Sequence, residues 1–205
     1  MVNVIQHKCF PTIINEFEFD MDKQEYDLVI NELNDEGGWL DDTYKDSVPA
    51  VLFKQTDANL GSRIPKFTNQ IGEITRKVCE QYSYKYDSFD ITGMWANKLQ
   101  KGDTHPPHTH SNNIFSGVYY LEGGSEIQFF DPRPQASVLQ PNTTEDNFNN
   151  SSMVGFSSDK GVGLIFPSWL QHWVTRTNKT RMSISWNVIL RGDYGKPNTL
   201  QNSNI

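Results

Sequence analysis

Three of the five histidines in this chain lie within six positions, in the stretch 103–110. In an extended strand, side chains at i and i+2 point to the same face, so His108 and His110 can contact one metal ion. A third ligand must come from elsewhere in the chain. His172 is the best candidate, because it follows the apolar run 163–166. Three imidazoles would leave several coordination positions of the metal open, as in non-haem iron sites.

Arg181 follows His172 by nine residues and begins a strand-like run. The alternation of a strand places polar residues on one of its faces, namely Arg181, Ser183, Ser185 and Asn187. The same alternation places Met182, Ile184, Trp186 and Val188 on the other. This pattern predicts a polar lining inside a barrel. An arginine there suits a carboxylate held by two hydrogen bonds, with the serine hydroxyls as supporting donors.

Together these motifs resemble the 2-oxoglutarate and Fe(II)-dependent oxygenases, in particular their prolyl-hydroxylase-like branch. The resemblance rests on the histidine stretch, on Ser116-Gly-Val-Tyr-Tyr-Leu121, on the distal His172 and on the Arg-x-Ser run that starts at Arg181. It covers roughly residues 90–191 and is greatest for a group of small oxygenases of marine bacteria and their phages. It implies Fe(II), 2-oxoglutarate as cosubstrate, dioxygen, and hydroxylation of a C–H bond with release of succinate and carbon dioxide.

The resemblance also implies roles for individual residues. The metal ligands, and with them the catalytic residues, would be His108, His110 and His172. The residues expected to bind the cosubstrate are Arg181, Ser183, Ser185, Tyr120 and Asn97. The resemblance implies that Tyr120 supports Arg181 at the distal carboxylate, the alternative being a core tyrosine bonded to the backbone. Asn97 is expected from strand alternation over 89–100, which places it on a mostly apolar inner face, where it either lines the site or has its amide satisfied by the backbone.

One position departs from the family pattern, because the usual carboxylate ligand is replaced by His110. All three ligands would then be neutral imidazoles. Asp103 or Asp131 could supply the missing carboxylate, or His105 could displace one of the two neighbouring ligands. If His105 is not a metal ligand, we expect it to lie behind the ligands or on the substrate side.

Two other functions are compatible with the same residues. A cupin-type dioxygenase with three histidine ligands would need no 2-oxoglutarate, but it would leave Arg181 as an unexplained buried charge. A noncatalytic jelly-roll module, with a binding or structural role, would keep the strands without needing the histidines.

Length, net charge and cysteine content restrict the domain organisation, the partners and the location of the protein. A chain of 205 residues fits one domain, and its net charge of −7 argues against nucleic-acid binding. No signal peptide or membrane span is evident, which predicts a cytoplasmic protein, in the host cell if a phage encodes it. Cys9 and Cys79 are expected to be reduced and buried. A homodimer is compatible with these features, and the substrate is either a small molecule or a peptide or protein.

The pattern of elements predicts a mainly β fold with flanking helices, a double-stranded β-helix or jelly-roll barrel. Residues 1–89 would supply a first strand and supporting helices, 90–191 the barrel core, and 192–205 a frayed tail. The helices are expected at 20–36, capped by Asp20 and ended by Gly37-Gly38, and from 62 or 65 to 84, with irregular chain at 39–60 between them. The strands are expected at 10–19, 89–100, 114–122, 126–130, 151–157 and 161–167, with a long loop at the barrel mouth over 135–150.

Overall fold

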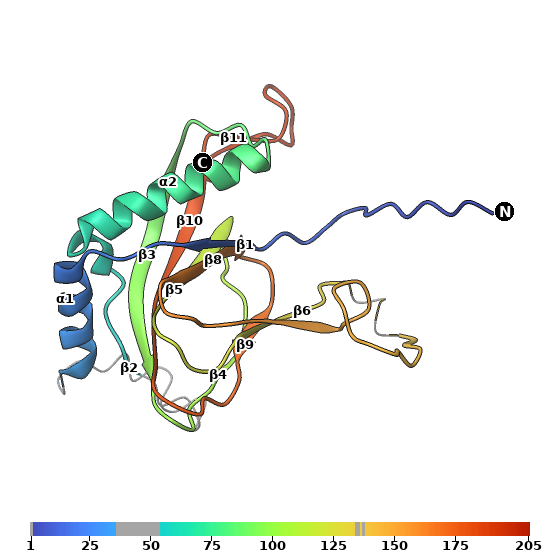
Figure 1. The fold of residues 1–205 in the computed structure, drawn as a ribbon. Helices are drawn as coiled ribbons and strands as arrows, with labels where there is room; N and C mark the ends of the chain where they lie inside the picture. Colours follow the sequence, from blue (N-terminus) through green and yellow to red (C-terminus); the bar gives the residue numbers. More distant parts are fainter. Residues whose placement is uncertain (1, 36–53, 134–135, 137) are drawn as a thin grey trace.

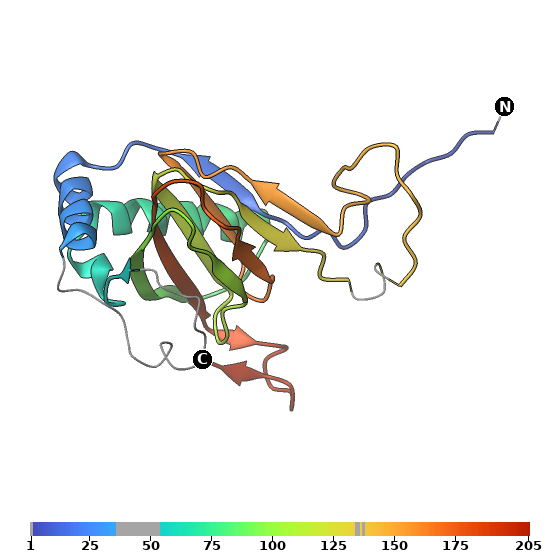
Figure 2. The same cartoon turned by 90° about the horizontal axis from the view of Figure 1, so that it is seen from below.

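A computed structural model describes residues 2–35, 54–133, 136 and 138–205 of the chain. Two antiparallel sheets form its body, with two helices on the outer side of the larger sheet (Figure 1). Turning the molecule shows the helices and the smaller sheet on opposite sides of the larger one (Figure 2). This architecture confirms the predicted double-stranded β-helix. No helix in the described part of the chain is long and apolar enough to cross a membrane.

The larger sheet has six strands and the smaller one four. In spatial order, the larger sheet consists of β1 (Asn15–Glu18), β8 (Val162–Pro167), β5 (Phe115–Glu122), β10 (Arg181–Arg191), β3 (Ser88–Leu99) and β2 (Lys54–Gln55). The smaller sheet consists of β4 (His105–His108), β9 (His172–Val174), β6 (Ile127–Phe130) and β7 (Met153–Phe156). The order explains how residues far apart in sequence come together, because β4 pairs directly with β9.

The helices cover the outer face of the larger sheet. They are α1 (Lys23–Asn34), the short 3-10 helix η1 (Leu60–Ser62) and α2 (Pro65–Gln81). Phe67 and Ile71, one helical turn apart on α2, are fully buried in the same cluster as Ile184 and Trp186 of β10. Full burial of each such side chain contributes roughly 1.5–3 kcal/mol. This outer layer therefore fixes the position of the central strand β10.

The inner faces of the two sheets enclose a second apolar cluster. Its buried members are Val118, Tyr120, Ile127, Phe129, Leu164, Phe166 and Leu170. Arg181 and Ser183 are also buried, on the face of β10 opposite Ile184. The alternation predicted for β10 is thus confirmed, with apolar side chains under the helices and polar ones between the sheets.

The helix termini differ slightly from prediction, because a tertiary contact selects the cap. Asp22, not Asp20, caps α1, and its side chain accepts hydrogen bonds from the backbone of Gln24 and Glu25 at 3.0 and 3.3 Å. Glu25 in turn accepts the first free N–H groups of α2, from Lys66 at 2.8 Å and the following residue at 2.9 Å. The predicted helix end at 37–38 and most of the irregular stretch 39–60 lie outside the described residues.

The two ends of the chain also differ from prediction. The first strand covers only β1, and residues 2–14 form no regular element, with Phe10 98% exposed. Cys9 in this segment is exposed, so the expectation that both cysteines are buried is wrong for it, whereas Cys79 is buried and both are free thiols. The tail is not frayed throughout, because β11 (Asp193–Tyr194) pairs with β12 (Ser203–Asn204).

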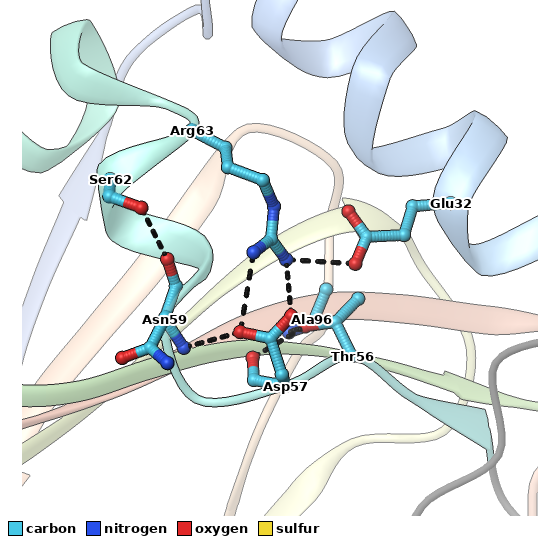
Figure 3. Close-up of polar contacts among 7 residues, drawn as sticks. All are labelled: Glu32, Thr56, Asp57, Asn59, Ser62, Arg63 and Ala96. Carbon is cyan, nitrogen blue, oxygen red and sulfur yellow. Dashed lines mark hydrogen bonds and ion pairs between the residues drawn. The ribbon is translucent and has the colours of Figure 1, made fainter.

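A polar cluster attaches the segment 54–63 to α1 and β3 (Figure 3). Arg63 donates to Glu32 of α1 at 2.8 Å and to Asp57 at 2.9 and 3.2 Å. The backbone N–H of Ala96 in β3 donates to the Thr56 hydroxyl at 3.0 Å. These contacts hold β2 at the edge of β3, directly opposite the inner-face residue Asn97.

Candidate functional site

The three predicted ligands, His108, His110 and His172, come together between the sheets. Their candidate ligand atoms all lie within 4.8 Å of one another. His108 ends β4 and is the register partner of His172 at the start of β9. His110 lies two residues beyond the end of β4 and still reaches the same site as His108, so the pair comes from the strand and its edge. The backbone N–H of His110 donates to the carbonyl of Ser168 at 2.9 Å, which holds it beside the turn before His172.

Two of the imidazoles are oriented by backbone carbonyls. The Nδ1 atom of His108 lies 2.8 Å from the carbonyl oxygen of Pro106, and that of His172 lies 2.9 Å from that of Leu170. An Nδ1–H that donates to a carbonyl leaves Nε2 with a free lone pair, which is the usual arrangement of a histidine that binds metal. The local fold therefore directs Nε2 of both rings toward the shared space.

Burial also keeps these rings in the neutral form that binds metal. Loss of solvation lowers the pKa of His172 to about 3 and that of His110 to about 4, and neighbouring imidazoles add to both effects. Burial likewise lowers the pKa of His108, although its hydrogen bond to Pro106 opposes the shift. The residues present thus fit a divalent metal ion with nitrogen preference, such as Fe(II) or Zn(II).

A buried hydroxyl network supports the turn between the ligands. Ser116 of β5 hydrogen-bonds to Ser168 at 2.8 Å and donates to Asn187 of β10 at 2.8 Å. Asn187 was grouped with Arg181 on one polar face, but its side chain belongs to this network. The sequence gives no signal for the role of Ser168, because the partner of its hydroxyl, Ser116, lies 52 residues earlier in the chain.

Arg181 is buried on the inner face, with 3% of its surface exposed. Its guanidinium donates to Ser183 at 3.3 Å and its Cζ lies 4.9 Å from the centre of the Tyr120 ring. No carboxylate in the described part of the chain pairs with it. Burial lowers the pKa of this arginine, and the neighbouring Tyr120 opposes the shift. A buried cation without an anionic partner is costly and indicates a missing anion.

Polar atoms without partners mark the same inner face. The Nε atom of Arg181, the hydroxyl of Tyr120 and the Oδ1 atom of Asn97 are buried and have no hydrogen-bond partner among the described residues. Asn97 donates to the Ser185 hydroxyl at 3.2 Å, so the predicted lining residues Asn97 and Ser185 contact each other. Buried polar groups of this kind are normally satisfied, so their clustering indicates room for a polar ligand.

The alternative carboxylate ligands are engaged elsewhere. Asp103 accepts the backbone N–H of Gln100 at 2.7 Å, and Asp131 pairs with Arg133 at 2.8 Å. Among the described residues, the only group of histidine, cysteine or acidic side chains able to hold a metal ion is the three-histidine group. His105 is outside that group, but its ring stacks on that of His108 with centroids 4.1 Å apart.

Comparisons with known proteins agree with this geometry. Residues 93–187, a little under half of the chain, match the model of a family described as "Putative 2OG-Fe(II) oxygenase". A search of the curated proteins found no match.

Several solved structures share the fold of the chain. A prolyl-4-hydroxylase from Pseudomonas putida is 11% identical, with a TM-score of 0.60 over 88% of this chain and 94% of that one. A prolyl hydroxylase from Trichoplax adhaerens, solved with a hypoxia inducible factor peptide fragment, is 12% identical, with a TM-score of 0.59 over 86% and 83% of the two chains. The non-heme alpha ketoglutarate dependent epimerase SnoN from nogalamycin biosynthesis is 12% identical, with a TM-score of 0.57 over 92% and 83%. The barrel segment therefore matches the 2OG-Fe(II) oxygenase family by sequence, and the chain has the double-stranded β-helix fold of oxygenases of this kind.

Proposed function

We propose that this protein is an Fe(II)- and 2-oxoglutarate-dependent oxygenase that hydroxylates a C–H bond of its substrate. The observation that carries the proposal is the presence of two features in the space between the sheets, a histidine group on the smaller sheet and Arg181 on the larger one. Three neutral imidazoles with converging ligand atoms supply a metal site, and the unpaired guanidinium of Arg181 supplies a site for an anion. A dicarboxylate that chelates the metal through its keto acid end would satisfy both.

The residues of the chain have separate tasks in this proposal. His108, His110 and His172 would hold Fe(II), with Nδ1 of two of them fixed by backbone carbonyls. Arg181 would hold the distal carboxylate of 2-oxoglutarate, and the unpartnered Tyr120 hydroxyl would donate to it. When bound, ferrous iron and 2-oxoglutarate supply the oxidising power, as the diacid gives succinate and carbon dioxide and one atom of dioxygen enters the substrate.

The chain also limits side reactions by excluding water. Arg181, Tyr120 and His172 are all buried, and the apolar side chains of Phe129 and Phe166 pack against the His172 ring at centroid distances of 5.7 and 4.8 Å. In such a site the attraction between the guanidinium and a carboxylate is much stronger than in water. The same burial makes a cupin-type reaction without an anionic cosubstrate less consistent with the structure.

The proposal is tested by adding Fe(II) and 2-oxoglutarate to the protein without oxygen. We expect a visible charge-transfer band from the chelated keto acid, and succinate release once air is admitted. Arg181→Ala should lose the band at modest 2-oxoglutarate concentrations. Arg191→Ala is the matched control, because Arg191 ends the same strand in an exposed ion pair with Asp90. A band of equal strength in Arg181→Ala would contradict the assignment of the anion site.

A further inference from the structure

A fourth imidazole, His105, lies between the two halves of the candidate site. In β4 it is three residues before His108, and its register partner on β9 is Val174, two residues after His172. It is therefore displaced from the ligand group along β9, in the direction in which the chain continues toward Arg181. Its ring stacks on His108 at 4.1 Å with an interplanar angle of 25°.

The causes of the pKa shift of His105 agree with this position. Burial is the main cause that lowers the pKa of this ring well below 6.5, and the positive charges that add to the shift come from His108, His172, Arg181 and His110. Among the histidines of the site whose pKa shifts include charge effects, Arg181 is a cause for His105 alone. The position of the ring, stacked on His108 and displaced along β9 toward Arg181, rests on the ring contact and the strand register.

We infer that His105 is a cosubstrate-positioning residue, which donates a ring N–H hydrogen bond to the 2-oxoglutarate held between the metal and Arg181. This inference rests on the proposed function. A neutral imidazole has one N–H donor, and a hydrogen bond from it to a carboxylate is charge-assisted. Since His105 is absent from the group of converging ligand atoms, its role is to orient the diacid and not to hold the metal.

The inference is tested by measuring metal and diacid binding separately, with Zn(II) replacing Fe(II) so that no turnover occurs. Zn(II) affinity is measured by competition with a chelator, and 2-oxoglutarate affinity by calorimetry on the Zn(II)-loaded protein. His105→Phe keeps a planar ring but removes the donor, and His105→Gln restores an N–H group. His7→Phe, in the exposed N-terminal segment, is the matched control.

We expect His105→Phe to weaken 2-oxoglutarate binding by about tenfold to a hundredfold, the range for a lost charge-assisted hydrogen bond. Its Zn(II) affinity should stay within about threefold of the unaltered protein, and His105→Gln should recover most of the diacid affinity. Unchanged diacid binding in His105→Phe would overturn the role of His105 alone. Loss of Zn(II) binding would also overturn it, by making His105 a ligand. Absence of diacid binding in the unaltered Zn(II)-loaded protein would overturn both this inference and the proposed function.

Discussion

Replacing Arg181 by methionine should make the ligand-free protein more stable, although it removes the anion site. Arg181 is 3% exposed, its guanidinium donates to Ser183 at 3.3 Å, and its Nε–H is buried without a partner among the described residues. Each buried donor without a partner costs about 1–3 kcal/mol. The contact with the Tyr120 ring at 4.9 Å offsets about 0.5–2 kcal/mol of this cost.

We therefore expect Arg181→Met to raise the free energy of unfolding by about 1–3 kcal/mol, since replacing buried ionic groups by apolar side chains of similar volume often stabilises proteins by about this much. For a chain of this size, that gain raises the melting temperature by roughly 2–10 °C. The comparison requires the metal-free protein, measured by chemical denaturation with a chelator present. Arg191→Met, at the exposed end of the same strand, should change stability by less than about 0.5 kcal/mol.

Addition of ligand should remove this advantage. With Zn(II) and 2-oxoglutarate at about a hundred times its dissociation constant, the unaltered protein gains about 2.7 kcal/mol from the diacid, and Arg181→Met gains almost none of it. The two proteins should then be of similar stability, or in reversed order. If Arg181→Met were less stable than the unaltered protein without ligand by more than about 1 kcal/mol, the guanidinium would have a structural partner and the reasoning would fail.

Two further predictions concern the scaffold. Gly117→Ala should lower the free energy of unfolding by about 1–3 kcal/mol or more, because the added Cβ would lie 2.2 Å from the indole of Trp186. In Gly93→Ala the nearest atoms would be 3.8 Å from the added Cβ, so this substitution should have little steric effect. Chemical denaturation of both variants measures the two changes in the free energy of unfolding. The pKa of Asp22 is lowered from 3.8, first by the hydrogen bond from Lys66, so its carboxylate stabilises the protein above the unfolded pKa and loses this effect as pH falls through the folded one. Asp22→Asn should therefore be less stable at neutral pH and equal at pH values below the folded pKa, and a pH-independent difference in denaturation midpoints would argue against this carboxylate effect.

The sequence predicts the barrel strands well because each has a distinct environment on its two faces. On β10, the apolar side chains must lie under the helices and the polar ones between the sheets, so a register shift of one residue would bury the wrong set. The spacing of Phe67 and Ile71 predicts α2 for a similar reason. Patterns with a fixed period thus carry most of the information on fold.

Tertiary contacts explain what the sequence could not predict. Asp20 and Asp22 are equally good caps by residue type, and the contacts of Asp22 with the first turn of α1 and with Lys66 decide between them. Because β4 ends at His108, the position of His110 is fixed by the hydrogen bond from its N–H to the carbonyl of Ser168, which the i, i+2 spacing does not predict. The hydrogen bonds of Ser168 connect it to residues more than 50 positions earlier in the chain, Ser116 through its hydroxyl and His110 and Ile114 through its backbone. Local spacing therefore identifies the candidate ligands but not what orients them.

The neutral ligand set has a consequence for cosubstrate binding that can be measured. With three uncharged imidazoles, a divalent ion and Arg181 place three positive charges around a diacid that carries two negative ones. His110→Asp removes one positive charge from this balance, close to the diacid. At an effective dielectric constant of about 20, a unit charge some 4–8 Å away changes the interaction by about 2–4 kcal/mol before screening.

The expected result is that Zn(II)-loaded His110→Asp binds 2-oxoglutarate at least about tenfold more weakly than His110→Asn, which has the same shape without the charge. Calorimetry on the two loaded proteins makes the comparison, and Zn(II) affinity should be higher for the aspartate variant because a carboxylate attracts the cation. Equal diacid affinity would show that the charge at position 110 is not felt by the diacid. In that case the replacement of a carboxylate by His110 would have no electrostatic consequence for cosubstrate binding, and its effect would be limited to the metal.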